Sequence, residues 1–79
     1  MVNFEIMLAS PPDREQLVVM VMVDKEQLCE INRENGMKTI ELYRRQDGQP
    51  WSLPLGECLA ALNQACERLE EALGTAPNA

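Results

Sequence analysis

The sequence contains no histidine. Histidine is the usual general base at neutral pH and a principal zinc ligand, so its absence removes Ser-His-Asp and Cys-His catalysis and histidine-containing zinc sites. The sequence also has no glycine-rich phosphate loop and no recognisable nucleic-acid-binding module. We therefore expect no catalytic residues, no cofactor and no metal, and predict that the protein is not an enzyme.

Basic residues are scarce. Seven lysines and arginines stand against thirteen acidic residues, which gives a net charge of −6. This balance argues against binding to a nucleic-acid backbone and suits a partner that is itself basic. No apolar run approaches the ~18 residues of a membrane span, and the N-terminus lacks the basic segment and apolar core of a secretory signal. The chain resembles small bacterial proteins in its general features, and we expect it to be cytoplasmic. We expect neither a membrane nor nucleic acid among its partners.

Cysteines are few and irregularly spaced. Three of them, an odd number, do not make a disulfide framework. Cys58 and Cys66 would be roughly 12 Å apart along one helix, which is too far for a disulfide. A metal site formed by these two thiols and Cys29 is the alternative, but reduced thiols in the core of a cytosolic protein are favoured.

The sequence instead offers strands. Leu17–Val23 is an unbroken apolar run, typical of a strand that is buried on both faces. Alternation and turn residues predict three more strands, at 2–9, about 27–34 and 37–45. Asn35-Gly36 favours a two-residue type I′ turn between the last two strands. The register that follows places Ile31 opposite Ile40 and Glu30 opposite Glu41.

One amphipathic helix is predicted from Pro54 to Leu73, with Gly74 ending it. Its apolar stripe is Leu55, Leu59, Leu62, Cys66, Leu69 and Leu73. The predicted fold class is α+β: a four-stranded antiparallel β-meander with one C-terminal helix on one face, in a single domain of residues 1–74 with a flexible tail at 75–79. The residues expected beneath the helix are Phe4, Ile6, Leu17, Val19, Val21, Cys29, Ile31, Ile40 and Leu42. A two-residue turn at Lys25-Glu26 would exchange the two faces.

The other face of the sheet has no predicted cover. We expect it to form an interface or binding face that comprises Met7, Val18, Met20, Met22, Leu28, Glu30, Glu41, Tyr43 and Arg45. An open apolar patch of several hundred Å² is near the limit for soluble monomers, so we predict a homodimer, joined sheet against sheet or edge to edge. Arg33 or Arg45 of the second chain would then pair with the acidic residues. The alternative is that this face docks a different protein.

Three smaller features each have two interpretations. The Glu30–Glu41 pair suits general acid–base work, although ion pairing or solvation is favoured. The Tyr43-Arg44-Arg45 segment would suit an anion or a partner carboxylate, but a solvated strand end with Arg45 near Glu26 is favoured. Trp51 is either a loop anchor for a partner or a cap on the core.

The function predicted from these features is that of a small acidic, non-enzymatic interaction protein. We expect it to associate with itself and to act as an inhibitor-, immunity- or antitoxin-like partner of a basic protein. The alternative is a small-ligand-binding protein that uses the Met-lined apolar face of the sheet.

Overall fold

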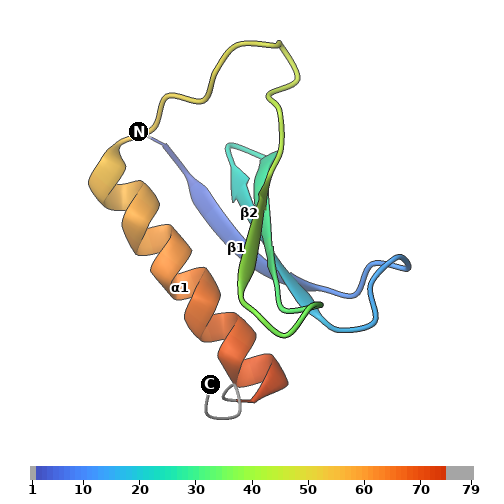
Figure 1. Cartoon of the computed structure of the whole chain (residues 1–79). Helices are drawn as coiled ribbons and strands as arrows, with labels where there is room; N and C mark the ends of the chain where they lie inside the picture. Colours follow the sequence, from blue (N-terminus) through green and yellow to red (C-terminus); the bar gives the residue numbers. More distant parts are fainter. Residues whose placement is uncertain (1, 75–79) are drawn as a thin grey trace.

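The computed structural model describes residues 2–74 and forms one antiparallel sheet with a helix across it (Figure 1). The strands are β1 (Phe4–Ala9), β2 (Val18–Val23), β3 (Glu26–Asn32) and β4 (Thr39–Leu42), arranged in that order, and the helix is α1 (Leu55–Leu73). This confirms the predicted α+β meander. The predicted tail at 75–79 lies outside the described residues.

The turn between β2 and β3 is formed by two residues, Asp24 and Lys25. Asp24 and Lys25 both have positive φ, 49° and 72°, and Val23 pairs with Glu26 across them. This is the geometry of a two-residue type I′ hairpin, whose twist matches that of the strands. Continued without interruption, this register would place Val19 opposite Glu30.

A β-bulge corrects the register. Between Val21 and Met22 the pairing shifts by one residue, so that Val21 lies opposite Cys29 and Val19 opposite Ile31. The extra residue in β3 is Leu28, which is buried in the core cluster. Because one residue of shift exchanges the faces of a strand, the bulge keeps the valines and Ile31 on the same side. The predicted face assignment of β2 is confirmed.

The β3–β4 register is also as predicted, with Ile31 opposite Ile40 and Glu30 opposite Glu41. The predicted two-residue turn is wrong, because the ladder already ends at Asn32 and Thr39 and the connection is longer. Gly36 has a φ of 87°, and its N–H donates to the carbonyl of Arg33. Asparagine at 35 has no positive φ, which a type I′ turn would require at both positions.

Helix α1 lies closest to the sheet through small residues. Its fully buried positions are Ala61, Ala65 and Leu69, while Leu62 and Cys66 are half-buried at the side of this stripe. Leu55 and Leu59, which the predicted apolar stripe of the helix would bury, are exposed. Alanines allow a close approach of the helix backbone to the sheet, which rotates the buried stripe away from the leucines that the periodicity favoured.

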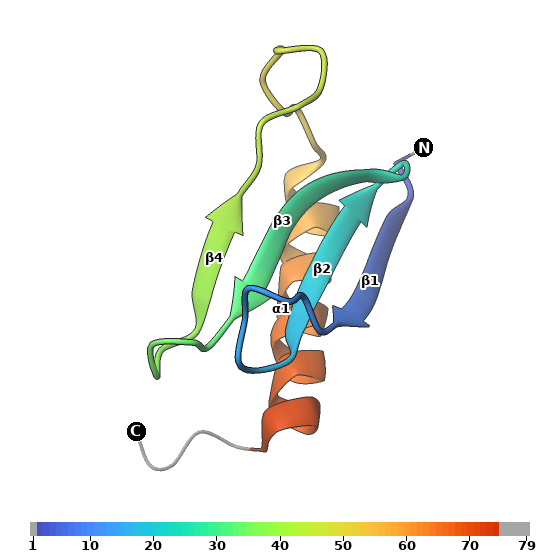
Figure 2. The same ribbon diagram turned by 90° about the vertical axis from the view of Figure 1, so that its right-hand side faces the viewer.

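Helix α1 packs on β1, β2 and β3 and leaves β4 beside it (Figure 2). The core therefore joins the helix to Val19, Val21, Cys29 and Ile31, with Phe4 and Ile6 packed against it. The expectation that Leu17, Ile40 and Leu42 lie beneath the helix is wrong, since all three are exposed. No helix among the described residues combines the length and apolarity needed to cross a membrane.

Arg33 holds the C-terminal end of α1. Its guanidinium donates to the carbonyl oxygens of Gly74 and Leu73, at 3.0 and 3.4 Å. The last turn of α1 carries no basic residue of its own, so a cation from the β3–β4 connection satisfies the unpaired carbonyls there. Gly74 ends the helix with a φ of 83°, as its place in the sequence predicts.

Candidate functional site

The face of the sheet opposite α1 is covered in part by the chain itself. The connection between β1 and β2, residues 10–17, passes across this face in front of β2 and β3 (Figure 2). We call this segment the strap. Its backbone N–H groups at Glu15 and Gln16 both donate to the carboxylate of Glu34, each at 2.9 Å. These bonds fix the strap to the end of β3.

Arg14 joins the strap to the middle of the sheet. Its guanidinium lies 3.0 Å from the Glu30 carboxylate and also donates to Glu41 Oε2. The Asn32 amide donates to the same two carboxylates, at 2.8 and 2.9 Å. The Tyr43 hydroxyl also donates to Glu30, at 3.4 Å. We call this group of contacting side chains the polar cluster; its members are Arg14, Glu30, Asn32, Glu41 and Tyr43.

Burial gives the polar cluster its chemical character. Glu30 is only 4% exposed, and its charge is balanced by Arg14. Burial opposes the charged form of Arg14, but the neighbouring Glu30 and Glu41 carboxylates outweigh this and raise the pKa of Arg14. Burial, followed by the charge of Glu30, raises the pKa of Tyr43. The predicted acidic pair therefore exists, but its oxygens already accept bonds from one guanidinium, one amide and one phenol hydroxyl.

The prediction that this face is open is wrong in its central part. Val18 and Met20 are buried there within the single chain, together with Glu30. Leu28, which was expected on this face, belongs instead to the core cluster that α1 covers. The counter-ion of Glu30 and Glu41 is Arg14 of the same chain, where Arg33 or Arg45 of a second chain was expected. Prediction failed here because an eight-residue polar connection was not recognised as a cover. The available signal for this cover was Arg14, a basic residue in the connection that can pair with the opposed Glu30 and Glu41.

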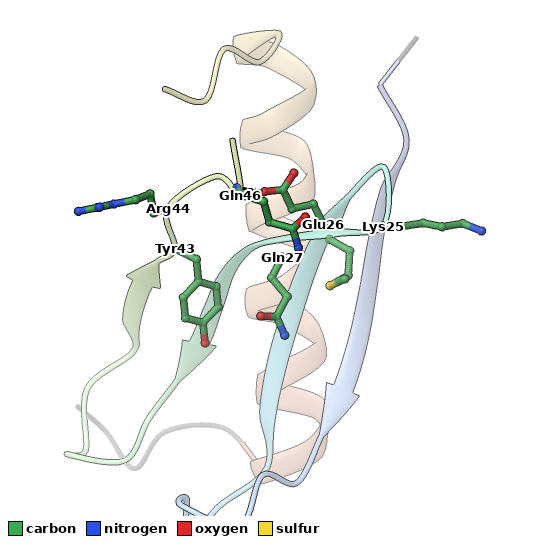
Figure 3. Close-up of a pocket in the computed structure, with 7 residues that line it drawn as sticks. Lys25, Glu26, Gln27, Tyr43, Arg44 and Gln46 are labelled. Carbon is green, nitrogen blue, oxygen red and sulfur yellow. Dashed lines mark hydrogen bonds between the residues drawn. The ribbon is translucent and has the colours of Figure 1, made fainter. Parts of the chain in front are cut away.

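The part of this face beyond the strap contains a shallow cavity of about 340 Å³ (Figure 3). Tyr43 and Gln27 stand at its centre, while the side chains of Lys25 and Arg44 point away from it to either side. Among the described residues, Met22 is the one methionine that lines it, beside mostly polar groups. The alternative function, small-ligand binding, predicts an apolar site lined by methionines, and this cavity has a different lining.

The remaining predicted residues have structural contacts. Trp51 is half-buried against the core, and its Nε1–H donates to the carbonyl of Tyr43 at 3.0 Å. The Arg45 guanidinium lies 5.4 Å from the Trp51 ring centre and 3.2 Å from Asp47. Glu26 accepts a bond from the Gln46 backbone and does not pair with Arg45. Met7 on β1 is exposed.

An apolar groove that sequence reasoning missed lies between α1 and β4. Its cavity of about 240 Å³ is bounded by Ile31, Ile40, Leu62 and Cys66. Leu55 and Leu59 continue the same side of the helix at steps of four and three residues, and Leu42 continues the same face of β4. Leu42 and Leu55 are 69% and 73% exposed. We call this surface the apolar groove; its residues are Ile31, Ile40, Leu42, Leu55, Leu59, Leu62 and Cys66.

One end of the apolar groove is closed by an ion pair. Lys38 Nζ lies 2.8 Å from Glu70 Oε1, between the start of β4 and the last turns of α1. The hydrogen bond from Lys38 lowers the pKa of Glu70, and the same bond raises that of Lys38. The groove was missed because its leucines and isoleucines were assigned to the core, whereas α1 packs on β1, β2 and β3 and does not reach β4.

The three cysteines are free thiols. Cys29 is fully buried beneath α1, and burial raises its pKa to about 11. Cys58 and Cys66 are half-buried on the helix. Within residues 2–74, no group of three or more cysteine or acidic side chains is arranged to hold a metal ion.

Searches of protein-family models, of curated proteins and of solved structures give no match for this chain. The candidate surfaces are therefore interpreted from their own geometry.

Proposed function

We propose that this protein acts by binding, without catalysis of its own. It pairs with a second copy of itself and serves as an acidic inhibitor-, immunity- or antitoxin-like partner of a basic protein. The proposal rests on surfaces that suit contact with another protein, and on a polar cluster whose two carboxylates accept hydrogen bonds from side chains of the same chain.

The observation that carries the proposal is the exposed part of the apolar groove. Large aliphatic side chains gather there from β4 and from one side of α1, with Leu42 and Leu55 both more than two-thirds exposed. Patches of a few hundred Å² on small proteins commonly mark protein-binding sites. A second protein would remove these side chains from water, which supplies the main favourable term in association.

The exposed acidic residues support the proposal that the partner is a basic protein. Glu57, Glu67 and Glu71 are exposed along α1, and Asp13 and Glu15 are exposed on the strap. With a net charge of −6, the chain would attract a basic protein over distances near the Debye length of about 8–10 Å. This term would raise the association rate and would weaken with salt.

Self-association is tested by sedimentation equilibrium of the purified chain from micromolar to millimolar concentration. We expect a mass that rises from one chain of 8.9 kDa to two. A mass of one chain over the whole range would contradict self-association.

The basic partner is tested by affinity capture from the native host at two salt concentrations. The wild-type bait should retain a basic protein, and the variant Glu57→Lys/Glu67→Lys/Glu71→Lys should lose it. The variant Asn63→Ala, also on the exposed surface of α1, serves as the control. Capture of the same proteins by all three baits would contradict a role for the acidic surface.

A further inference from the structure

We propose that two copies join through the free edge of β4, antiparallel about a twofold axis, so that the two sheets become continuous. This inference rests on the proposed self-association and names its surface. Each copy would fill the space beside the other's apolar groove, with both helices on the same face of the joined sheet.

The backbone of β4 has the hydrogen-bonding groups that this arrangement needs. The N–H of Tyr43 donates to the carbonyl of Leu28 at 2.9 Å, so Tyr43 directs its backbone groups toward β3. Backbone direction alternates along an antiparallel strand. Glu41 therefore also faces β3, while the N–H and C=O groups of Ile40 and Leu42 point outward from the edge. These outward groups are a template for another strand.

The side chains of the same residues supply the apolar contact. Ile40 and Leu42 lie on the helix side of β4, and both are exposed. In a twofold pair, the Ile40 and Leu42 side chains of one copy lie beside the same side chains of the other. Leu55 and Leu59 of each helix would then flank the new strand pair, in which the Ile40 and Leu42 side chains of the two copies would cover one another.

The register of such a pair is restricted. In an antiparallel pair, residues directly opposite each other point to the same face of the sheet. At the twofold axis, one residue must therefore lie opposite its own copy in the second chain. An axis at Glu41 would set two carboxylates opposite each other, which is unfavourable. An axis at Ile40 or at Leu42 avoids this and sets identical aliphatic side chains together.

Charge also favours this edge for a chain of net charge −6. The one acidic residue of β4 is Glu41, and it is balanced by Arg14. Lys38 and Arg44 flank the strand on either side. Two copies can therefore approach along β4 without bringing their acidic surfaces together.

The other free edge, β1, lacks these properties. Its helix side is already packed, because Phe4 and Ile6 lie against the core. The surface beside these residues on α1 is polar, formed by Gln64 and Arg68. A strand added there would meet no apolar groove.

Amide hydrogen exchange measured by NMR at rising protein concentration tests the inference. The amides of Ile40 and Leu42 should exchange rapidly in the monomer and slow about tenfold when about nine-tenths of the chains are paired, since exchange then requires dissociation. The Tyr43 amide, bonded to β3 in each copy, is the internal control and should change much less.

The variant Leu42→Lys gives a second measurement. It should shift the sedimentation profile to one chain while the circular dichroism of the fold is kept, because Leu42 is exposed in the monomer. Leu8→Lys, at an exposed leucine of the β1 edge, is the matched control and should leave the pairing unchanged.

The outcomes separate the two proposals. A dimer in which Ile40 and Leu42 exchange rapidly, or one that survives Leu42→Lys, would overturn pairing through β4 and leave self-association standing. A chain that remains a monomer would overturn both.

Discussion

The two faces of the sheet are covered by different means. One is covered by α1, a helix of 19 residues that packs alanines and leucines on an apolar surface. The other is covered in part by the strap, a short polar connection that Arg14 and Glu34 hold in place. A small domain can thus close a second face without a second apolar element, provided that its buried charge is balanced.

The contrast is sharpest at two neighbouring residues of β3. Cys29 points toward α1 and is fully buried, in surroundings that favour its neutral thiol. Glu30 points to the opposite face, where Arg14, Asn32 and Tyr43 contact its carboxylate. Adjacent side chains therefore lie in an apolar layer and in an ionic one, because a strand alternates its faces.

The largest expected effect is on the strap side. Arg14→Met should lower the free energy of unfolding more than the other changes described below, since it leaves the buried Glu30 carboxylate without its counter-ion. Urea unfolding measures this change. Arg44→Met, which removes an exposed arginine, should stay within about 0.5 kcal/mol of wild type.

A double variant makes the comparison sharper. Arg14→Met combined with Glu30→Met should regain a large part of the loss, because replacing both members of a buried ion pair by apolar side chains is often nearly neutral. Equal instability of the single and double variants would mean that Arg14 does not act through Glu30.

On the helix side, position should decide the cost of losing a leucine. Leu69→Ala should destabilise by about 2–5 kcal/mol, because Leu69 is fully buried against the sheet. Leu55→Ala, at an exposed position of the same helix, should cost about 0.5 kcal/mol or less. Unfolding at low protein concentration removes any contribution from pairing. Similar losses in both variants would show that Leu55 is also packed against the sheet, and would contradict its exposure.

A smaller effect is expected from alkaline pH. Burial raises the pKa of Cys29 from 9.0 in the free thiol to about 11, so the folded state binds this proton more tightly than the unfolded state. The contribution of Cys29 to stability is constant below pH 9 and falls as pH rises from about 9 toward 11. Comparing the pH dependence of wild type with that of Cys29→Val isolates this effect from other groups. Identical alkaline profiles would contradict a buried, neutral thiol.

Sequence reasoning succeeded where local patterns act. The β-meander, the helix span and the Glu30–Glu41 register follow from alternation, turn residues and helical periodicity. It failed where packing chooses between similar patterns. Alanines at 61 and 65 and leucines at 55 and 59 both recur at helical spacing, and the close approach of the backbones decided in favour of the alanines.

The candidate surfaces were harder to predict than the fold. The polar cluster joins Arg14 to Glu41 across 27 positions of the chain, and no local pattern reports such a contact. The apolar groove depends on the width of one helix relative to four strands, which is a property of the assembled layers. Its residues have the same composition as core residues, so hydrophobicity alone assigned them to the core.

By itself, the sequence determined the order of the elements and the pairing of consecutive strands, because these depend on contacts near in the chain. It also determined which residues can carry charge and that no histidine is present. Only the tertiary structure decided that the strap closes one face, that a bulge at Leu28 keeps the valines beneath α1, and that β4 extends beyond the helix. These outcomes depend on how closely the helix, the sheet and the strap pack together. That packing is decided by the shapes and buried charges of residues that lie far apart in the chain.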